Sequence, residues 1–137
     1  NGGTKEISDK DNKRINRVKI GPHFYLNQFE SHDTKEVKLS PELLKKLELL
    51  TVQLGKSLEI KSGYLTPEEY DDFDNSKQEH YHLAGKAVDI KKVENKSLDQ
   101  IAETAEKIGF NGIGGYEWGL HLDLREEKDK WDNRRKE

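Results

Sequence analysis

An apolar stripe between a start signal and a stop signal places the strongest constraint on how this chain folds. Ser40 is a good N-cap, Pro41 suits the first helical position, and Gly55 is a natural helix stop. Leucines recur between them at the spacing of one helix face: Leu43, Leu44, Leu47, Leu50 and Leu54. The sequence therefore predicts a helix over residues 41–54 that must bury this face against another layer.

A second amphipathic helix is predicted after Ser97. Ser97 and Gln100 have the spacing of a capping box, and Gly109 ends the pattern. Its apolar side is formed by Leu98, Ile101, Ala102, Ala105 and Ile108. Pro67 also starts a short helical segment that runs to Tyr70.

Three segments have the alternation of half-buried strands: residues 57–61, 86–91 and 118–125. In the last of them, leucines point one way and polar residues point the other, namely His121, Asp123 and Arg125. We therefore predict an α+β fold with a small, mostly antiparallel sheet. Helices pack on one face of this sheet, and the other face carries the polar residues and the zinc site considered below.

The chain length of 137 residues fits one domain with polar ends. We expect residues 1–16 to be a flexible N-terminal arm, residues 17–125 to be the domain, and residues 126–137 to be a charged, fraying C-terminal tail on which Trp131 can dock. A short edge strand is expected over residues 18–20. Loops are expected over residues 71–79 and over the glycine-rich residues 111–115.

Composition excludes several classes of function. A net charge of -3 argues against a nucleic-acid partner, because phosphate binding needs a basic surface. The absence of cysteine excludes disulfides, thiolate zinc sites and cysteine nucleophiles. No apolar run is long enough to span a membrane, and we expect a monomer.

A candidate metal site combines His82, Asp89 and His121. Gly85 lets the backbone turn between His82, which we place in a loop, and Asp89 on the following strand. His121 on a later strand can supply a third ligand and leave a fourth position open, as in catalytic zinc sites. The spacing alone is a weak signal, because each of these residues could be an ordinary surface residue.

Three motifs in this order resemble those of the M15-type zinc peptidases, which include D-Ala-D-Ala carboxypeptidases and endolysins and share a hedgehog-like fold. In chain order they are Ser62-Gly63-Tyr64, His82-x-x-Gly85-x-Ala87-x-Asp89, and His121-x-Asp123-x-Arg125. The resemblance covers roughly residues 24–125. It implies one Zn²⁺ held by His82, Asp89 and His121.

The resemblance also implies a function and a location. The expected activity is hydrolysis of the peptide stems of bacterial peptidoglycan, as a D,D-carboxypeptidase or an endopeptidase, by a metal-activated water. The expected location is secreted, in the bacterial cell envelope, or associated with a phage.

Two departures from the family pattern leave alternatives open. Many members have Arg after the Ser-Gly-Tyr segment, where this chain has Leu65, so we consider Arg125 and Lys86 as substitute cations. Many members have an acidic residue three positions before the last His, where this chain has Trp118. An alternative function is therefore a catalytically degenerate zinc domain that binds cell-wall fragments or a protein partner.

The candidate general bases are Glu117, which we prefer, and Asp123. A bulge near Gly119 would be needed to bring Glu117 to the metal, whereas Asp123 could instead orient a metal ligand. Either carboxylate could also be only a solvated charge. The candidate substrate-binding residues are Ser62, Tyr64, His80, Trp118 and Arg125.

Overall fold

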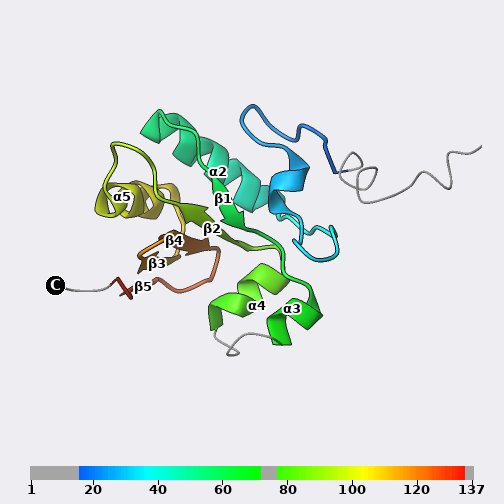
Figure 1. Cartoon of the computed structure of the whole chain (residues 1–137). Coiled ribbons are helices and arrows are strands. Elements are labelled where there is room, and N and C mark those ends of the chain that lie inside the picture. The colour runs from blue at the N-terminus through cyan, green and yellow to red at the C-terminus, as the bar shows by residue number, and fades with distance from the viewer. Residues whose placement is uncertain (1–15, 72–76, 135–137) are drawn as a thin grey trace, which may run out of the picture.

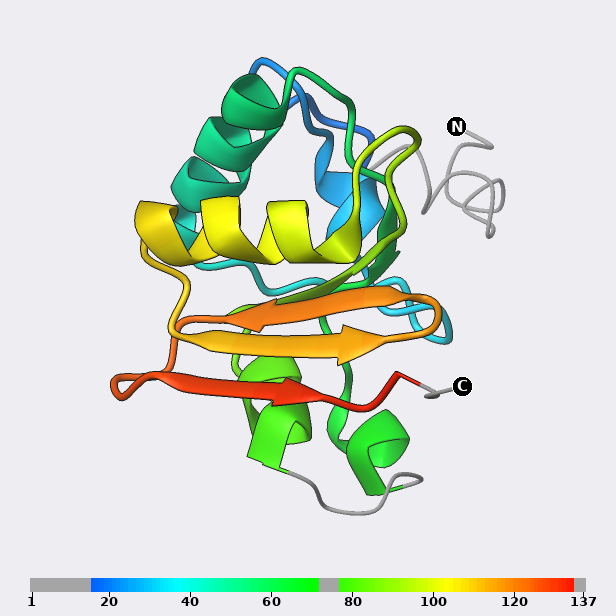
Figure 2. The ribbon, with the colours of Figure 1, turned by 90° about the vertical axis from the view of Figure 1, so that its left-hand side faces the viewer.

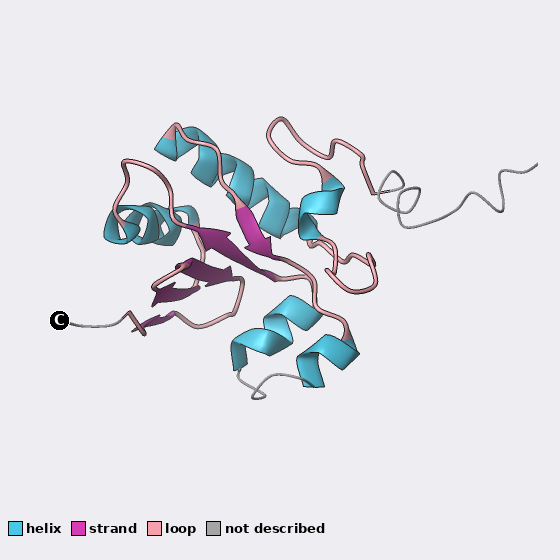
Figure 3. Cartoon of the chain, in the orientation of Figure 1, coloured by secondary structure: helices cyan, strands magenta, loops and turns pink. Residues whose placement is uncertain are grey.

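The computed structural model describes residues 16–71 and 77–134. Residues 1–15, which make up most of the predicted N-terminal arm, lie outside the described part of the chain. Figure 1 shows the arrangement of helices and strands around one sheet, and Figure 3 colours the same view by secondary structure.

The sheet has the strand order β1-β2-β4-β3-β5. Its strands are β1 (Ile60–Ser62), β2 (Ala87–Lys91), β3 (Gly112–Tyr116), β4 (Gly119–Asp123) and β5 (Asp129–Asp132). All neighbours pair antiparallel except β3 and β5, which are parallel. The predicted α+β class and the mostly antiparallel sheet are therefore confirmed.

Two capped helices cover one face of this sheet (Figure 2). Helix α2 (Pro41–Leu54) begins at Ser40, whose side chain accepts hydrogen bonds from two backbone amides, and it ends at Gly55 in the left-handed conformation. Helix α5 (Leu98–Ile108) begins with a complete capping box formed by Ser97 and Gln100. Both helices lie where the sequence predicts them.

The hydrophobic core lies between these helices and the sheet. Its fully buried members from α2 and α5 include Leu43, Leu47, Leu50, Ile101 and Ala105, and those from the strands include Val88, Ile90, Leu120 and Leu122. Alternation along β2 and β4 turns the intervening residues to the opposite face.

Two short helices lie on that opposite face (Figure 2): α3 (Pro67–Asp71) and α4 (Lys77–Leu83). The loop predicted over residues 71–79 is wrong at both ends, because Asp71 belongs to α3 and α4 begins at Lys77. Residues 72–76 of this predicted loop lie outside the described part of the chain. His82 consequently lies on a helix rather than in a loop. The polar composition of this segment hid the helix, which buries few apolar side chains.

Two other segments also differ from the prediction. The glycine-rich residues expected to form a turn instead form β3, and residues Asp129–Asp132 of the predicted C-terminal tail form β5. A Cβ atom on Gly112 would overlap the Asp123 side chain, and one on Gly114 would overlap the Trp131 indole. These glycines therefore make room for larger neighbours, although glycine normally disfavours strands.

The N-terminal part of the described chain packs beside α2. Only an isolated bridge between Lys19 and Tyr25 stands where a short edge strand was expected, and it is followed by the 3-10 helix η2 (Leu26–Phe29). Phe24 and Phe29 are buried in the core. Among the described helices, none is long and apolar enough to cross a membrane.

Candidate metal centre

Three side chains from three different elements meet on the face of the sheet that carries α4. His82 comes from α4, Asp89 from β2 and His121 from β4. His82 Nε2 lies 3.2 Å from Asp89 Oδ1, and His121 Nδ1 lies 3.0 Å from the same oxygen. One ligand atom from each residue lies within 4.8 Å of the others, so the three residues could hold one metal ion.

The backbone explains how these residues come together. Asp89 and His121 are direct cross-strand partners in the β2–β4 ladder, so their side chains share a face. Gly85 turns the chain from α4 into β2 with a φ of 74°, a conformation that favours glycine. A Cβ atom on Gly85 would also crowd the backbone of Lys38.

Hydrogen bonds assign the ring nitrogen that each histidine presents to the centre. His82 Nδ1 lies 2.7 Å from the carbonyl oxygen of Gly63, which can only accept, so Nδ1 carries the proton and Nε2 is left for a metal. His121 Nε2 donates to Asp123 Oδ2 at 2.8 Å, which leaves Nδ1 for a metal.

The electrostatics of the centre favour charged side chains in the absence of a metal. Burial acts to raise the pKa of Asp89, but the charges of His82 and His121 and their hydrogen bonds hold that pKa well below its usual range. Burial acts to lower the pKa of His121, but hydrogen bonds to Asp123 and Asp89 raise it. The site thus attracts positive charge, whether a proton or a metal cation.

Asp123 is held between His121 and Arg125. Its carboxylate accepts Arg125 Nε at 2.8 Å and Arg125 Nη2 at 2.6 Å, besides the bond from His121. Asp123 is fully buried, and although burial acts to raise its pKa, the hydrogen bonds from Arg125 and His121 lower it. The Arg125 guanidinium also donates to Asp129 at 3.0 Å. Asp123 is therefore placed to orient His121.

Glu117 lies at the tip of the β3–β4 hairpin, where its side chain is exposed. The β3–β4 ladder runs in regular register from Gly112 opposite Asp123 to Tyr116 opposite Gly119. The bulge that would shift Glu117 toward the metal is therefore absent from this ladder.

The predicted substrate-binding residues are placed differently from one another. Ser62 is the cross-strand partner of Asp89. Tyr64 is buried, and this burial, followed by the charge of Glu36, raises its pKa. His80 is exposed on α4. Trp118 stacks on Tyr116 with 4.9 Å between ring centroids.

Arg125 is buried and has its donors engaged by two carboxylates, so it is not free to bind a substrate. Lys86, the other cation considered, is exposed and lines a pocket with Tyr81 and the acidic residues after β4.

Sequence reasoning missed contributors to this centre. The Gly63 carbonyl belongs to a motif that was recognised, but its bond to His82 depends on tertiary structure. Trp131 lies 5.6 Å from the His121 ring between centroids. Docking of Trp131 was expected, because it is the one apolar residue in the charged stretch after Arg125, but its contact with His121 was not.

The donor set suits zinc chemically, since two imidazoles and one carboxylate are common zinc ligands and leave a coordination position open. The model of the Peptidase M15 family matches residues 23–123, which include all three ligand candidates. This chain belongs to the peptidase M15 family. M15 peptidases are zinc-dependent metallopeptidases that act on peptidoglycan. A search of curated proteins gives no match to this chain.

Proposed function

We propose that this M15 peptidase hydrolyses the peptide stems of bacterial peptidoglycan with one zinc ion held by His82 Nε2, Asp89 and His121 Nδ1. The observation that carries the proposal is the convergence of these three donors within 4.8 Å inside the region matched by the family. Zinc in such a site supplies Lewis-acid chemistry, which polarises a peptide carbonyl and makes water more acidic. We further propose that the enzyme acts outside the cytoplasm, where this substrate is found.

The chain's own residues have separate roles in this proposal. Gly63 and Asp123 fix the ring orientation of His82 and His121 through hydrogen bonds to their outer nitrogens. Glu117 takes the proton of the attacking water and returns it to the leaving amine. We assign this step to Glu117 because the Asp123 carboxylate is already occupied by His121 and Arg125. Since the regular β3–β4 hairpin holds Glu117 exposed at its tip, the assignment requires this tip to approach the metal position when substrate binds.

The replacement of the family's Arg by Leu65 and the engagement of Arg125 favour cleavage of an internal bond over removal of a terminal residue. A carboxypeptidase needs a cation for the free carboxylate of its substrate. Leu65, which stands at the family's Arg position, is buried, and Arg125 is engaged by Asp123 and Asp129. We therefore propose endopeptidase activity.

The decisive experiment is digestion of purified peptidoglycan by zinc-loaded wild type, Glu117→Gln and Asp123→Asn, with products identified by mass. Wild type should release fragments cut within the peptide stem, and Glu117→Gln should lose activity with its zinc content unchanged. No release of fragments by wild type with stoichiometric zinc would overturn the hydrolase assignment.

Products shortened by a single terminal residue would overturn the endopeptidase assignment. Lys61 would then be the cation to test, because it is held over Trp118 and has no carboxylate partner among the residues described. Lys61→Ala would in that case raise KM with little change in kcat.

A second candidate function is a zinc domain that binds cell-wall fragments without cutting them. The exposed position of Glu117 at the hairpin tip and the buried Leu65 favour this alternative. It predicts that the protein co-sediments with insoluble peptidoglycan and leaves its peptides intact, and turnover by wild type would reject it.

A further inference from the structure

Strand β5 lies beyond the region matched by the family, yet it brings an aromatic side chain to the metal centre. The family match ends at residue 123, and β5 covers Asp129–Asp132. In register, Gly114 on β3 pairs with His121 of β4 on one side and with Trp131 of β5 on the other. The three residues therefore lie in one row across the sheet.

Gly114 lets the two side chains of this row meet. A Cβ atom at this position would overlap the Trp131 indole, so the ring lies directly against the β3 backbone. The indole thereby reaches across to His121, with 5.6 Å between ring centroids and 39° between ring planes.

Other contacts fix the indole in this place. Trp131 Nε1 donates to the Tyr116 hydroxyl at 2.7 Å. The Arg125 guanidinium carbon lies 4.9 Å from the indole centroid, within the range of a cation–π contact. Because Arg125 also holds Asp123, and Asp123 holds His121, these four side chains form a closed ring of contacts.

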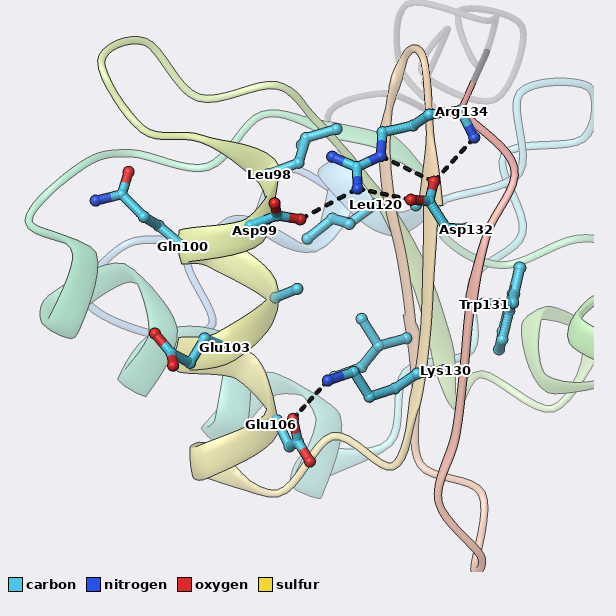
Figure 4. Close-up of a pocket in the computed structure, with 13 residues that line it drawn as sticks. Leu98, Asp99, Gln100, Glu103, Glu106, Leu120, Lys130, Trp131, Asp132 and Arg134 are labelled. Carbon is cyan, nitrogen blue, oxygen red and sulfur yellow. Dashed lines mark hydrogen bonds and ion pairs between the residues drawn. The ribbon is translucent and has the colours of Figure 1, made fainter. Parts of the chain in front are cut away.

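The two faces of β5 contact different parts of the protein. Figure 4 shows Lys130 extended toward Glu106 on α5, whereas the Trp131 indole lies on the other side of the strand. Lys130 Nζ lies 2.9 Å from Glu106 Oε1. Lys130 therefore offers a matched control, since it anchors the same strand without contacting the metal ligands.

From these contacts we infer that Trp131 is a positioning residue for the metal ligand His121. This inference rests on the proposed function, because it takes the zinc ion bound by His121 from it. The indole covers the His121 ring, which is 1% exposed, and keeps water away from the hydrogen bond between His121 and Asp123. A dry environment strengthens that bond and holds the ring with Nδ1 toward the metal position.

The test is zinc affinity, measured by competition with a chromophoric chelator on folded, metal-free protein. Trp131→Ala should raise the zinc Kd about 10- to 100-fold, as expected for the loss of an outer partner of a ligand. Gly114→Ala should also raise the Kd, because it displaces the indole without removing it. Trp131→Phe, which keeps an aromatic ring, should retain most of the affinity, and Lys130→Ala should bind zinc like wild type.

A spectroscopic measurement keeps the inference testable even if Trp131→Ala does not fold. The chain has two tryptophans, so in Trp118→Phe the remaining indole emission comes from Trp131. Zinc titration should change this emission in step with binding, because the indole contacts a ligand ring.

Three results would overturn the inference. Equal zinc affinity of wild type, Trp131→Ala and Gly114→Ala would overturn it while leaving the proposed function intact, as would stoichiometric zinc binding with no change in Trp131 emission. A wild type that binds no zinc would overturn both.

Discussion

The carbonyl oxygen of Gly63 lies 2.7 Å from His82 Nδ1, so a backbone atom of one motif fixes the ring of another. The backbone at Gly63 is held in place, because the amide of the next residue, Tyr64, donates a hydrogen bond to the Phe29 carbonyl at 2.9 Å. The Ser-Gly-Tyr segment therefore acts on the metal position through its main chain, independently of its side chains.

Gly63→Ala should weaken both the fold and the metal site. The added Cβ would lie 2.7 Å from the Phe29 carbonyl oxygen and 2.8 Å from Phe29 Cα, which forces the segment to shift. Such overpacking typically costs about 1–3 kcal/mol. Urea denaturation should show this loss, and zinc affinity should fall as His82 loses its acceptor. Gly115→Ala is the control, because the nearest atom to its Cβ is 3.4 Å away.

Asp123→Ala should destabilise the protein strongly, even without metal. It leaves the buried Arg125 without its bidentate partner, and removing one member of a buried ion pair costs about 3 kcal/mol or more. Lys128→Ala, which removes an exposed contact to Glu106 at 3.9 Å, should change stability little. Equal denaturation midpoints for these two variants would contradict the role given to Asp123.

The stability of the metal-free protein should depend on pH through His121 and the two aspartates. Folding raises the pKa of His121, so its contribution to the free energy of unfolding is complete below about pH 6.5. This contribution is lost as the pH rises through the pKa that His121 has in the folded state. The pKa values of Asp89 and Asp123 are lowered, so their contributions are complete above about pH 4 and are lost as the pH falls further. Stability should therefore be greatest between these limits.

Chemical denaturation of chelator-treated protein across this range tests the prediction. In His121→Gln, the decline in stability above about pH 6.5 should be smaller than in wild type. An identical decline in the two proteins would assign it to other groups.

Zinc should stabilise the wild type and not His82→Ala. A ligand that binds only the folded state at about 100 times its Kd adds about 2.7 kcal/mol. Thermal melts with zinc and with a chelator should therefore differ for wild type and coincide for the variant. A zinc-dependent shift of equal size in His82→Ala would place the metal elsewhere.

Local signals predicted the parts of the fold that local interactions determine. The N-caps Ser40 and Ser97 and the stops Gly55 and Gly109 bound the two long helices as expected. Strands β2 and β4 lie within the alternating segments 86–91 and 118–125, whereas β1 overlaps the predicted residues 57–61 only at Ile60 and Lys61. In contrast, β3 is a strand because Gly112 and Gly114 accommodate side chains that arrive from β4 and β5, which no local pattern reveals.

The candidate site also combines residues that sequence motifs indicate with contacts that only the tertiary structure reveals. His82, Asp89 and His121 lie together in the structure, and their role as zinc ligands stays a prediction. The sequence predicts that Arg125 binds substrate, whereas in the structure its guanidinium donates hydrogen bonds to Asp123 and Asp129. These contacts are made by buried side chains across the sheet, so they become visible only once the strands are in register. The catalytic assignment of Glu117 stays a prediction.

The parallel pairing of β5 with β3 has a practical consequence for defining this domain. A boundary drawn where the family match stops would strip away the outermost strand and leave the glycine-rich backbone of β3 with unpaired amides and carbonyls. Unprotected edges of this kind recruit strands from other molecules. A protein trimmed there should self-associate more than one extending through residue 134, whose edge strand β5 carries the charged residues Asp129, Lys130 and Asp132.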